Sequence, residues 1–188
     1  MNTEKSKKIY LYLAAIFIAA LIVCNLIANK FITIDLGFKT FVISAGILPY
    51  PITFLITDIL SEIYGKKKTA QIVWAGFGSS LFVLGVLLLA QQFTAIAGSP
   101  IDDETFNKVF GNSWRVIFAS MTAYLFAQLI DVRIYHFWKK KTSGKHLWLR
   151  NNFSTMFSQL VDTTIVVCVL FLGVRSHSEI IQFILDGW

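Results

Sequence analysis

Hydrophobic residues form five long runs along the chain, and short polar or basic segments separate them. The first run has no charged residue between positions 9 and 28. An α-helix rises about 1.5 Å per residue, so about 20 residues can cross a hydrocarbon core about 30 Å thick. The pattern therefore predicts membrane-spanning helices over residues 9–29, 46–64, 70–97, 114–138 and 151–174.

Two segments do not follow this pattern. Residues 31–45 contain two runs rich in β-branched and aromatic residues on either side of Gly37, which predicts a short β-hairpin. Lipid cannot form hydrogen bonds with the unpaired backbone groups of a hairpin. We therefore expect the hairpin to lie at the extracellular surface or to insert into the helix bundle. Residues 178–188 begin like a sixth helix, but eleven residues are too few to cross a bilayer.

The composition agrees with a membrane protein. Hydrophobic residues make up 55% of the chain and charged residues only 15%, whereas soluble domains carry about 25% charge. We therefore expect an all-α membrane protein. Residues 1–188 would form one transmembrane domain with five spans, a hairpin after the first helix and an incomplete sixth segment.

The net charge of +6 could suggest nucleic acid as a partner, but the basic residues lie in short clusters between the apolar runs. Three such clusters are the N-terminal tail, Lys66–Lys68 and residues 139–150. They alternate with the hairpin and an acidic loop, as topology signals do. We therefore expect no nucleic-acid partner, a multi-pass protein of the inner (plasma) membrane, and an N-terminus in the cytoplasm.

Two carboxylates interrupt the second run. Asp58 and Glu62 are four residues apart, so a helix places both on one face. An aspartate at the centre of a membrane helix costs about 2.5–3.5 kcal/mol on insertion scales, so polar groups inside the protein should meet them. Glu62 lies nearer the cytoplasmic end, where Arg133 could pair with it, whereas Asp58 lies deeper and is the better candidate for a polar cavity.

The fifth run carries a polar stripe on one side, because its members are spaced by 4, 3, 1 and 3 residues. The stripe consists of Asn151, Thr155, Ser158, Gln159 and Asp162.

Signals for catalysis and for metal binding are weak. The chain lacks the usual hydrolase and phosphate-binding motifs, and its three histidines have no metal-ligand spacing. An intramembrane enzyme using Asp58 and Asp162 stays open as a lesser alternative. Carboxylates and amides instead suit a planar, donor-rich or cationic solute. We therefore expect a transporter of a small polar molecule, with no metal and no cofactor.

Two segments resemble the signature segments of a known family. They are PITFLITDILSEIYGKKK, at Pro51–Lys68, and LRNNFSTMFSQLVDT, at Leu149–Thr163. Both are similar to segments of the queuosine precursor transporter family, which is related to vitamin uptake transporters and resembles substrate-binding components of energy-coupling-factor systems.

The resemblance implies a six-helix bundle that imports 7-deazaguanine precursors of queuosine, such as 7-cyano- or 7-aminomethyl-7-deazaguanine, for tRNA modification. The alternative is a substrate-binding subunit of an energy-coupling-factor vitamin transporter. The implied partners are a small-molecule substrate and the lipid bilayer, and a homo-oligomer stays open. By position, the family's motifs imply substrate contacts by Asp58, Glu62, Asn151, Gln159 and Asp162, with Asn25 and Arg150 as weaker additions.

Overall fold

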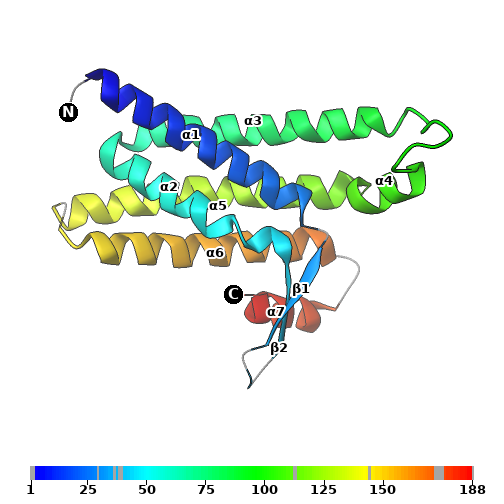
Figure 1. Cartoon of the computed structure of the whole chain (residues 1–188). Coiled ribbons are helices and arrows are strands. Elements are labelled where there is room, and N and C mark those ends of the chain that lie inside the picture. The colour runs from blue at the N-terminus through cyan, green and yellow to red at the C-terminus, as the bar shows by residue number, and fades with distance from the viewer. Residues whose placement is uncertain are drawn as a thin grey trace. The chain divides into compact units, whose positions relative to one another are not determined.

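The computed structural model describes residues 3–28, 30–35, 37, 40–111, 114–143, 145–171 and 176–187. Most of them are helical, which confirms the predicted all-α class (Figure 1). In chain order the elements are α1 (Thr3–Leu26), β1 (Phe31–Asp35), β2 (Thr40–Ser44), the 3-10 turn η1 (Ala45–Ile47), α2 (Tyr50–Ile63), α3 (Lys66–Ala90), α4 (Asp103–Phe110), α5 (Trp114–Lys141), α6 (Leu147–Phe171) and α7 (His177–Gly187).

Three helical stretches in the described part of the chain are long and apolar enough to cross a membrane. They are Glu4–Leu26, Ala45–Ile63 and Lys66–Ala90. This supports a membrane protein with at least the first three predicted spans. α5 and α6 are also long, at 28 and 25 residues, but they carry more polar side chains. Their crossing of the bilayer, and the count of five spans, stay predictions.

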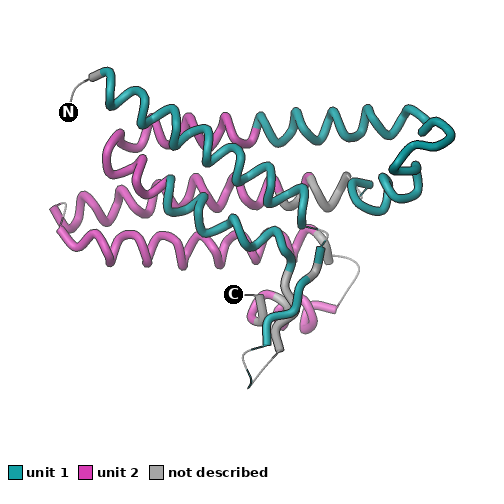
Figure 2. The backbone as a smooth tube through the Cα atoms, viewed as in Figure 1, with its two compact units in different colours: residues 1–56, 78–114 teal, residues 57–77, 115–188 magenta. Residues whose placement is uncertain are grey.

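The chain forms two compact units, coloured teal and magenta in Figure 2. The first contains residues 1–56 and 78–114, and the second contains residues 57–77 and 115–188. α2 and α3 each contribute residues to both units. The prediction of one transmembrane domain over the whole chain stays a prediction.

In the first unit, the strands are tied to the end of α1. β1 and β2 pair antiparallel, from Phe31 opposite Ser44 to Asp35 opposite Thr40, inside the predicted hairpin range. The Ser44 hydroxyl donates to the Ala28 carbonyl at 2.6 Å. Residues 36, 38 and 39, which belong to the predicted turn, lie outside the described residues, and the extracellular location of the hairpin stays a prediction.

The helix predicted to begin at residue 46 begins at Tyr50 instead. The Ser44 hydroxyl caps η1 by accepting a hydrogen bond from the Gly46 amide at 3.1 Å, so the chain first makes a 3-10 turn. Gly46 is buried there against α1: a Cβ at this position would lie 2.6 Å from the Cys24 carbonyl oxygen. The close approach explains why a residue without a side chain stands here.

The sequence did not predict α4, which lies in the polar segment between α3 and α5. Asp102 caps its N-terminus, since its carboxylate accepts a hydrogen bond from the Thr105 amide at 2.7 Å. Lys108 and Glu104 pair one turn apart, with 2.5 Å between Nζ and Oε1. None of the eight residues of this helix is buried, so the N-terminal cap and the local ion pair, and not a hydrophobic core, hold it.

Replacing Gly46 by alanine should destabilise the protein by about 1–3 kcal/mol, because the new Cβ forces α1 and η1 apart. The thermal unfolding midpoint of the purified protein in detergent measures this. Gly85→Ala is the matched control, since a Cβ there meets no atom within 4 Å. That variant should be neutral or more stable by up to about 1 kcal/mol. Equal losses in both variants would contradict a packing role for Gly46.

Acid should weaken the start of α4. Hydrogen bonds from the Thr105 side chain and amide hold the pKa of the Asp102 carboxyl below its usual range. The cap is therefore fully present above about pH 4, the ordinary value for aspartate, and is lost as the pH falls through the lowered pKa. NMR titration of the Thr105 amide should give a midpoint below that ordinary value. Asp102→Asn should keep the cap and abolish the titration, whereas an unshifted midpoint would contradict the capping bond.

Candidate functional site

The second unit brings α2 beside α5 through two hydrogen bonds. The Thr57 hydroxyl donates to Oε1 of Gln128 at 3.3 Å, and the Tyr135 hydroxyl donates to Oε2 of Glu62 at 2.7 Å. The bonded residues are 71 and 73 positions apart in the two pairs. Since the separation is nearly constant, the two helices run in parallel here, and residues 71 to 73 positions apart lie at about the same level.

This register places Asp58 of α2 level with Asp131 of α5. Both side chains are buried, with 6% and 1% of their surface exposed. The Ser158 hydroxyl, on α6, donates to Oδ1 of Asp131 at 3.2 Å. Asp58 interacts electrostatically with both Asp131 and Arg150. Among the described residues, Oδ1 of Asp58 and Oδ2 of Asp131 are buried and have no hydrogen-bond partner. We name Asp58 and Asp131 the carboxylate pair.

One turn further along α2, Glu62 joins three helices. Its Oε2 lies 2.5 Å from Nη2 of Arg150 on α6 and 2.8 Å from Nζ of Lys139 on α5. The Arg150 side chain is 1% exposed, and its guanidinium lies 5.2 Å from the centre of the Tyr135 ring. We name these four residues the Glu62 ion-pair group. Glu62 thus finds two positive partners within the protein.

The predicted pairing of Glu62 with Arg133 is therefore wrong. Tyr135 and Lys139 are four residues apart, so they share the face of α5 that meets Glu62. Arg133 lies two positions before Tyr135, on another face, and its side chain is exposed. The sequence indicates that Glu62 needs a positively charged partner, but it does not identify α6 as the helix that supplies the buried cation, Arg150.

The other predicted contacts on α6 are partly buried. Asn151, Gln159 and Asp162 all have intermediate exposure, and Oδ1 of Asn151 is buried without a hydrogen-bond partner among the described residues. Asn25 lies in the first unit, where its Nδ2 donates to the Leu21 carbonyl at 3.1 Å. A substrate contact by any predicted site residue stays a proposal.

The family described as "putative vitamin uptake transporter" matches residues 44–188. The chain belongs to this family. It is also similar to a protein of Bacillus subtilis and a protein of Haemophilus influenzae, both named "probable queuosine precursor transporter". The identities are 38% over 133 residues and 24% over 146 residues, covering 69% and 76% of this chain and 56% of each relative. No solved structure matches the chain.

The comparisons confirm the resemblance found in the sequence. The chain spans about half the length of the curated relatives it matches. The matched family range contains every predicted site residue except Asn25.

Sequence reasoning missed the part of the site that α5 provides. Gln128, Asp131 and Tyr135 are spaced by three and four residues, so they share one helix face, and all three are buried. That spacing could have been read from the sequence. In the sequence, however, the neighbouring Arg133 favours a structural ion pair with a carboxylate.

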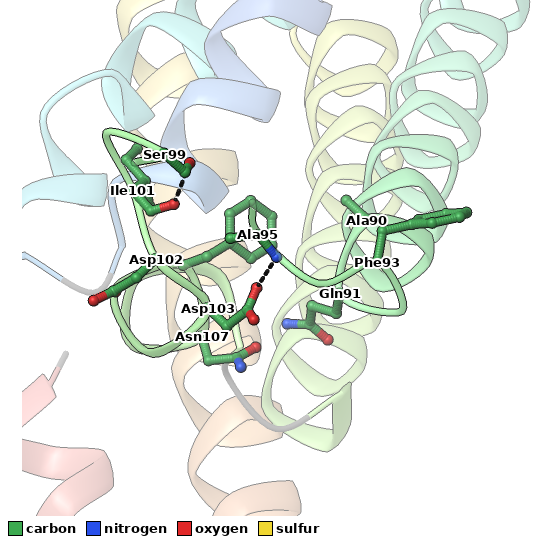
Figure 3. Close-up of a pocket in the computed structure, with 10 residues that line it drawn as sticks. Ala90, Gln91, Phe93, Ala95, Ser99, Ile101, Asp102, Asp103 and Asn107 are labelled. Carbon is green, nitrogen blue, oxygen red and sulfur yellow. Dashed lines mark hydrogen bonds between the residues drawn. The ribbon is translucent and has the colours of Figure 1, made fainter. Parts of the chain in front are cut away.

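The first unit contains a separate cavity of about 240 Å³, between the end of α3 and α4 (Figure 3). Asp103 accepts a hydrogen bond from the Ala95 amide at 2.9 Å, and the Ser99 hydroxyl donates to the Ile101 carbonyl at 2.7 Å. The carboxylates at this cavity are exposed and hold the loop and the helix cap. They give no sign of a solute site.

Removing the charge of Glu62 should cost more stability than removing that of Lys139. Glu62→Gln takes the carboxylate from a buried guanidinium, and we expect a loss of about 1–3 kcal/mol. Lys139→Gln removes a pair whose side chains are 31% and 38% exposed, so about 0–1 kcal/mol is expected. Thermal unfolding of the purified variants measures both. A larger loss for Lys139→Gln would show that the Arg150 contact does not dominate.

Proposed function

We propose that this chain forms part of an inner-membrane transporter that imports 7-deazaguanine precursors of queuosine for tRNA modification. Membership of the family and the names of the two relatives support this proposal. The single observation that carries it in the structure is the carboxylate pair. The pair is buried between helices, and two of its oxygen atoms have no hydrogen-bond partner in the part of the chain that the structure describes.

The chemistry of that pair suits a guanine-like ring. One carboxylate can accept two hydrogen bonds from the adjacent ring and amino N–H groups of such a ring. Asp58 can offer its Oδ1 for this purpose, and Asn151 on α6 can offer its Oδ1 to another donor. Gln159 and Asp162 on the same helix complete the set that we propose. We propose that these groups bind the solute without reacting with it, as the transporter names of the two relatives support.

The basic residues of the second unit support a cytoplasmic face at one end of it. Lys66, at the start of α3, and Lys139, near the end of α5, both act electrostatically on His136. The two basic clusters of the sequence therefore come together at that end. Under the positive-inside rule we propose that this end faces the cytoplasm, and the basic N-terminal tail supports a cytoplasmic N-terminus by the same rule.

Uptake of the precursor tests the function. The protein would be expressed in a bacterial host that cannot make the precursor, and queuosine in tRNA would be measured after the precursor is supplied. Wild type should restore the modification. Replacing both Asp58 and Asp162 by asparagine should lower initial uptake at least tenfold, because a lost hydrogen bond to a charged group costs about 1.5–3 kcal/mol.

The matched control is Glu104→Gln, which removes an exposed carboxylate of α4 and should leave uptake unchanged. Membrane levels of each variant would be compared by immunoblot. No modification with abundant wild type would contradict the function. Normal uptake by the double variant would contradict the assignment of these residues while leaving the function in place.

A further inference from the structure

The interior of the second unit holds more negative than positive charge around Asp58. The charged groups that act on Asp58 are Asp131 and Arg150. Arg150 is also held by Glu62, at 2.5 Å. One guanidinium therefore serves two carboxylates, Asp58 and Glu62, while Asp131 adds a third negative charge beside Asp58. Among the described residues, Lys139 pairs with Glu62, the outermost of the three.

Two buried carboxylates at one level cannot both stay ionised cheaply. Burial removes the water that stabilises each charge, and a like charge nearby adds repulsion. Hydrogen bonds relieve only part of this cost, because the side chains that donate to Asp131 carry neutral hydroxyls, from Ser154, Thr155 and Ser158. Oδ2 of Asp131, which is 1% exposed, and Oδ1 of Asp58 have no donor among the described residues. The carboxylate pair therefore lacks a positive charge that would compensate its own negative charges.

The oxygen atoms near the pair define what could supply that charge. Besides the two carboxylates, the Ser158 hydroxyl and Oε1 of Gln128 lie on the same faces of α6 and α5. All of them are hard oxygen donors, which suit a small hard cation, and no sulfur or imidazole group is among them. In the described part of the chain, no group of three or more His, Cys, Asp or Glu residues is arranged to hold a metal ion.

We propose that Asp58 and Asp131 form a binding site for one monovalent cation, a proton or a sodium ion, that is carried together with the solute. Its role in transport rests on the proposed function, because Asp58 is also a proposed contact of the solute. Filling the site removes the repulsion between the pair and leaves a single negative charge for the solute's N–H groups. Cation and solute would then favour each other's binding.

The titratable and charged groups around the pair are distributed over three helices. α2 contributes Glu62, α5 contributes Tyr135, His136 and Lys139, and α6 contributes Arg150 and Asp162. Any of them could add to a pH effect, so wild type must be compared with variants of the pair itself.

The experiment measures unfolding of the purified full chain in detergent, without any solute. Sodium chloride is compared with choline chloride at equal ionic strength, over a series of pH values. A sodium site predicts stabilisation that rises with sodium concentration, as for any ligand of the folded state. A proton site predicts no sodium effect. Instead, stability falls as the pH rises, with up to about a tenfold change in the unfolding equilibrium constant per pH unit.

Asp58→Asn and Asp131→Asn should each abolish the effect that wild type shows, and Glu104→Gln should keep it. The proposal is overturned if wild type responds to neither sodium nor pH, or if both asparagine variants respond as wild type does. If the asparagine variants fail to fold, Ser158→Ala replaces them in the test. This variant keeps both carboxylates but removes one oxygen atom near the pair, so it must shift the dependence of stability on sodium or pH. No solute is present in this experiment. A negative result would therefore overturn the cation site without contradicting the proposed uptake function, which the tRNA assay tests separately.

Discussion

The structure of the second unit depends on one constraint: a carboxylate placed in an apolar helix must meet its counter-charge inside the protein. Glu62 meets it with Arg150 from α6, Lys139 from α5 and the hydroxyl of Tyr135. Residues that are 73 to 88 positions away in the sequence are thereby held at the end of α2. The ion-pair group thus fixes which faces of the three helices meet, and the register of the deeper side chains follows from it.

The carboxylate pair lies on these fixed faces, but it is not satisfied in the same way. Asp58 precedes Glu62 by one helical turn, or about 6 Å along the axis. Over this short distance the exposed fraction falls from 38% for the Glu62 side chain to 6% for Asp58. A buried polar group without a hydrogen-bond partner lowers the stability of the folded protein. Such groups are therefore expected mainly at binding sites, where a ligand can supply the missing hydrogen bond.

The sequence predicted the helices well, because long apolar runs leave the chain few alternatives in a membrane. It predicted their ends less well, because local hydrogen bonds decide them: the Ser44 cap turns residues 45–47 into a 3-10 turn, and the Asp102 cap creates α4. The shared face of Asp58 and Glu62 followed from spacing alone. Their partners did not, because spacing within one helix says nothing about the register of another, and so Arg133 was preferred to Arg150.

The position of Glu62 near the helix end also explains why the deeper pair stays available. Arg150 acts on both Glu62 and Asp58, but its Nη2 donates to Glu62. If the guanidinium instead bonded to Asp58, it would offset one of the two negative charges of the pair from within, and the pair would attract a cation less. By holding Arg150, and by recruiting Lys139 to balance its own charge, Glu62 keeps negative charge in the interior. A partly exposed ion pair thereby preserves the negative charge of the buried carboxylate pair beside it.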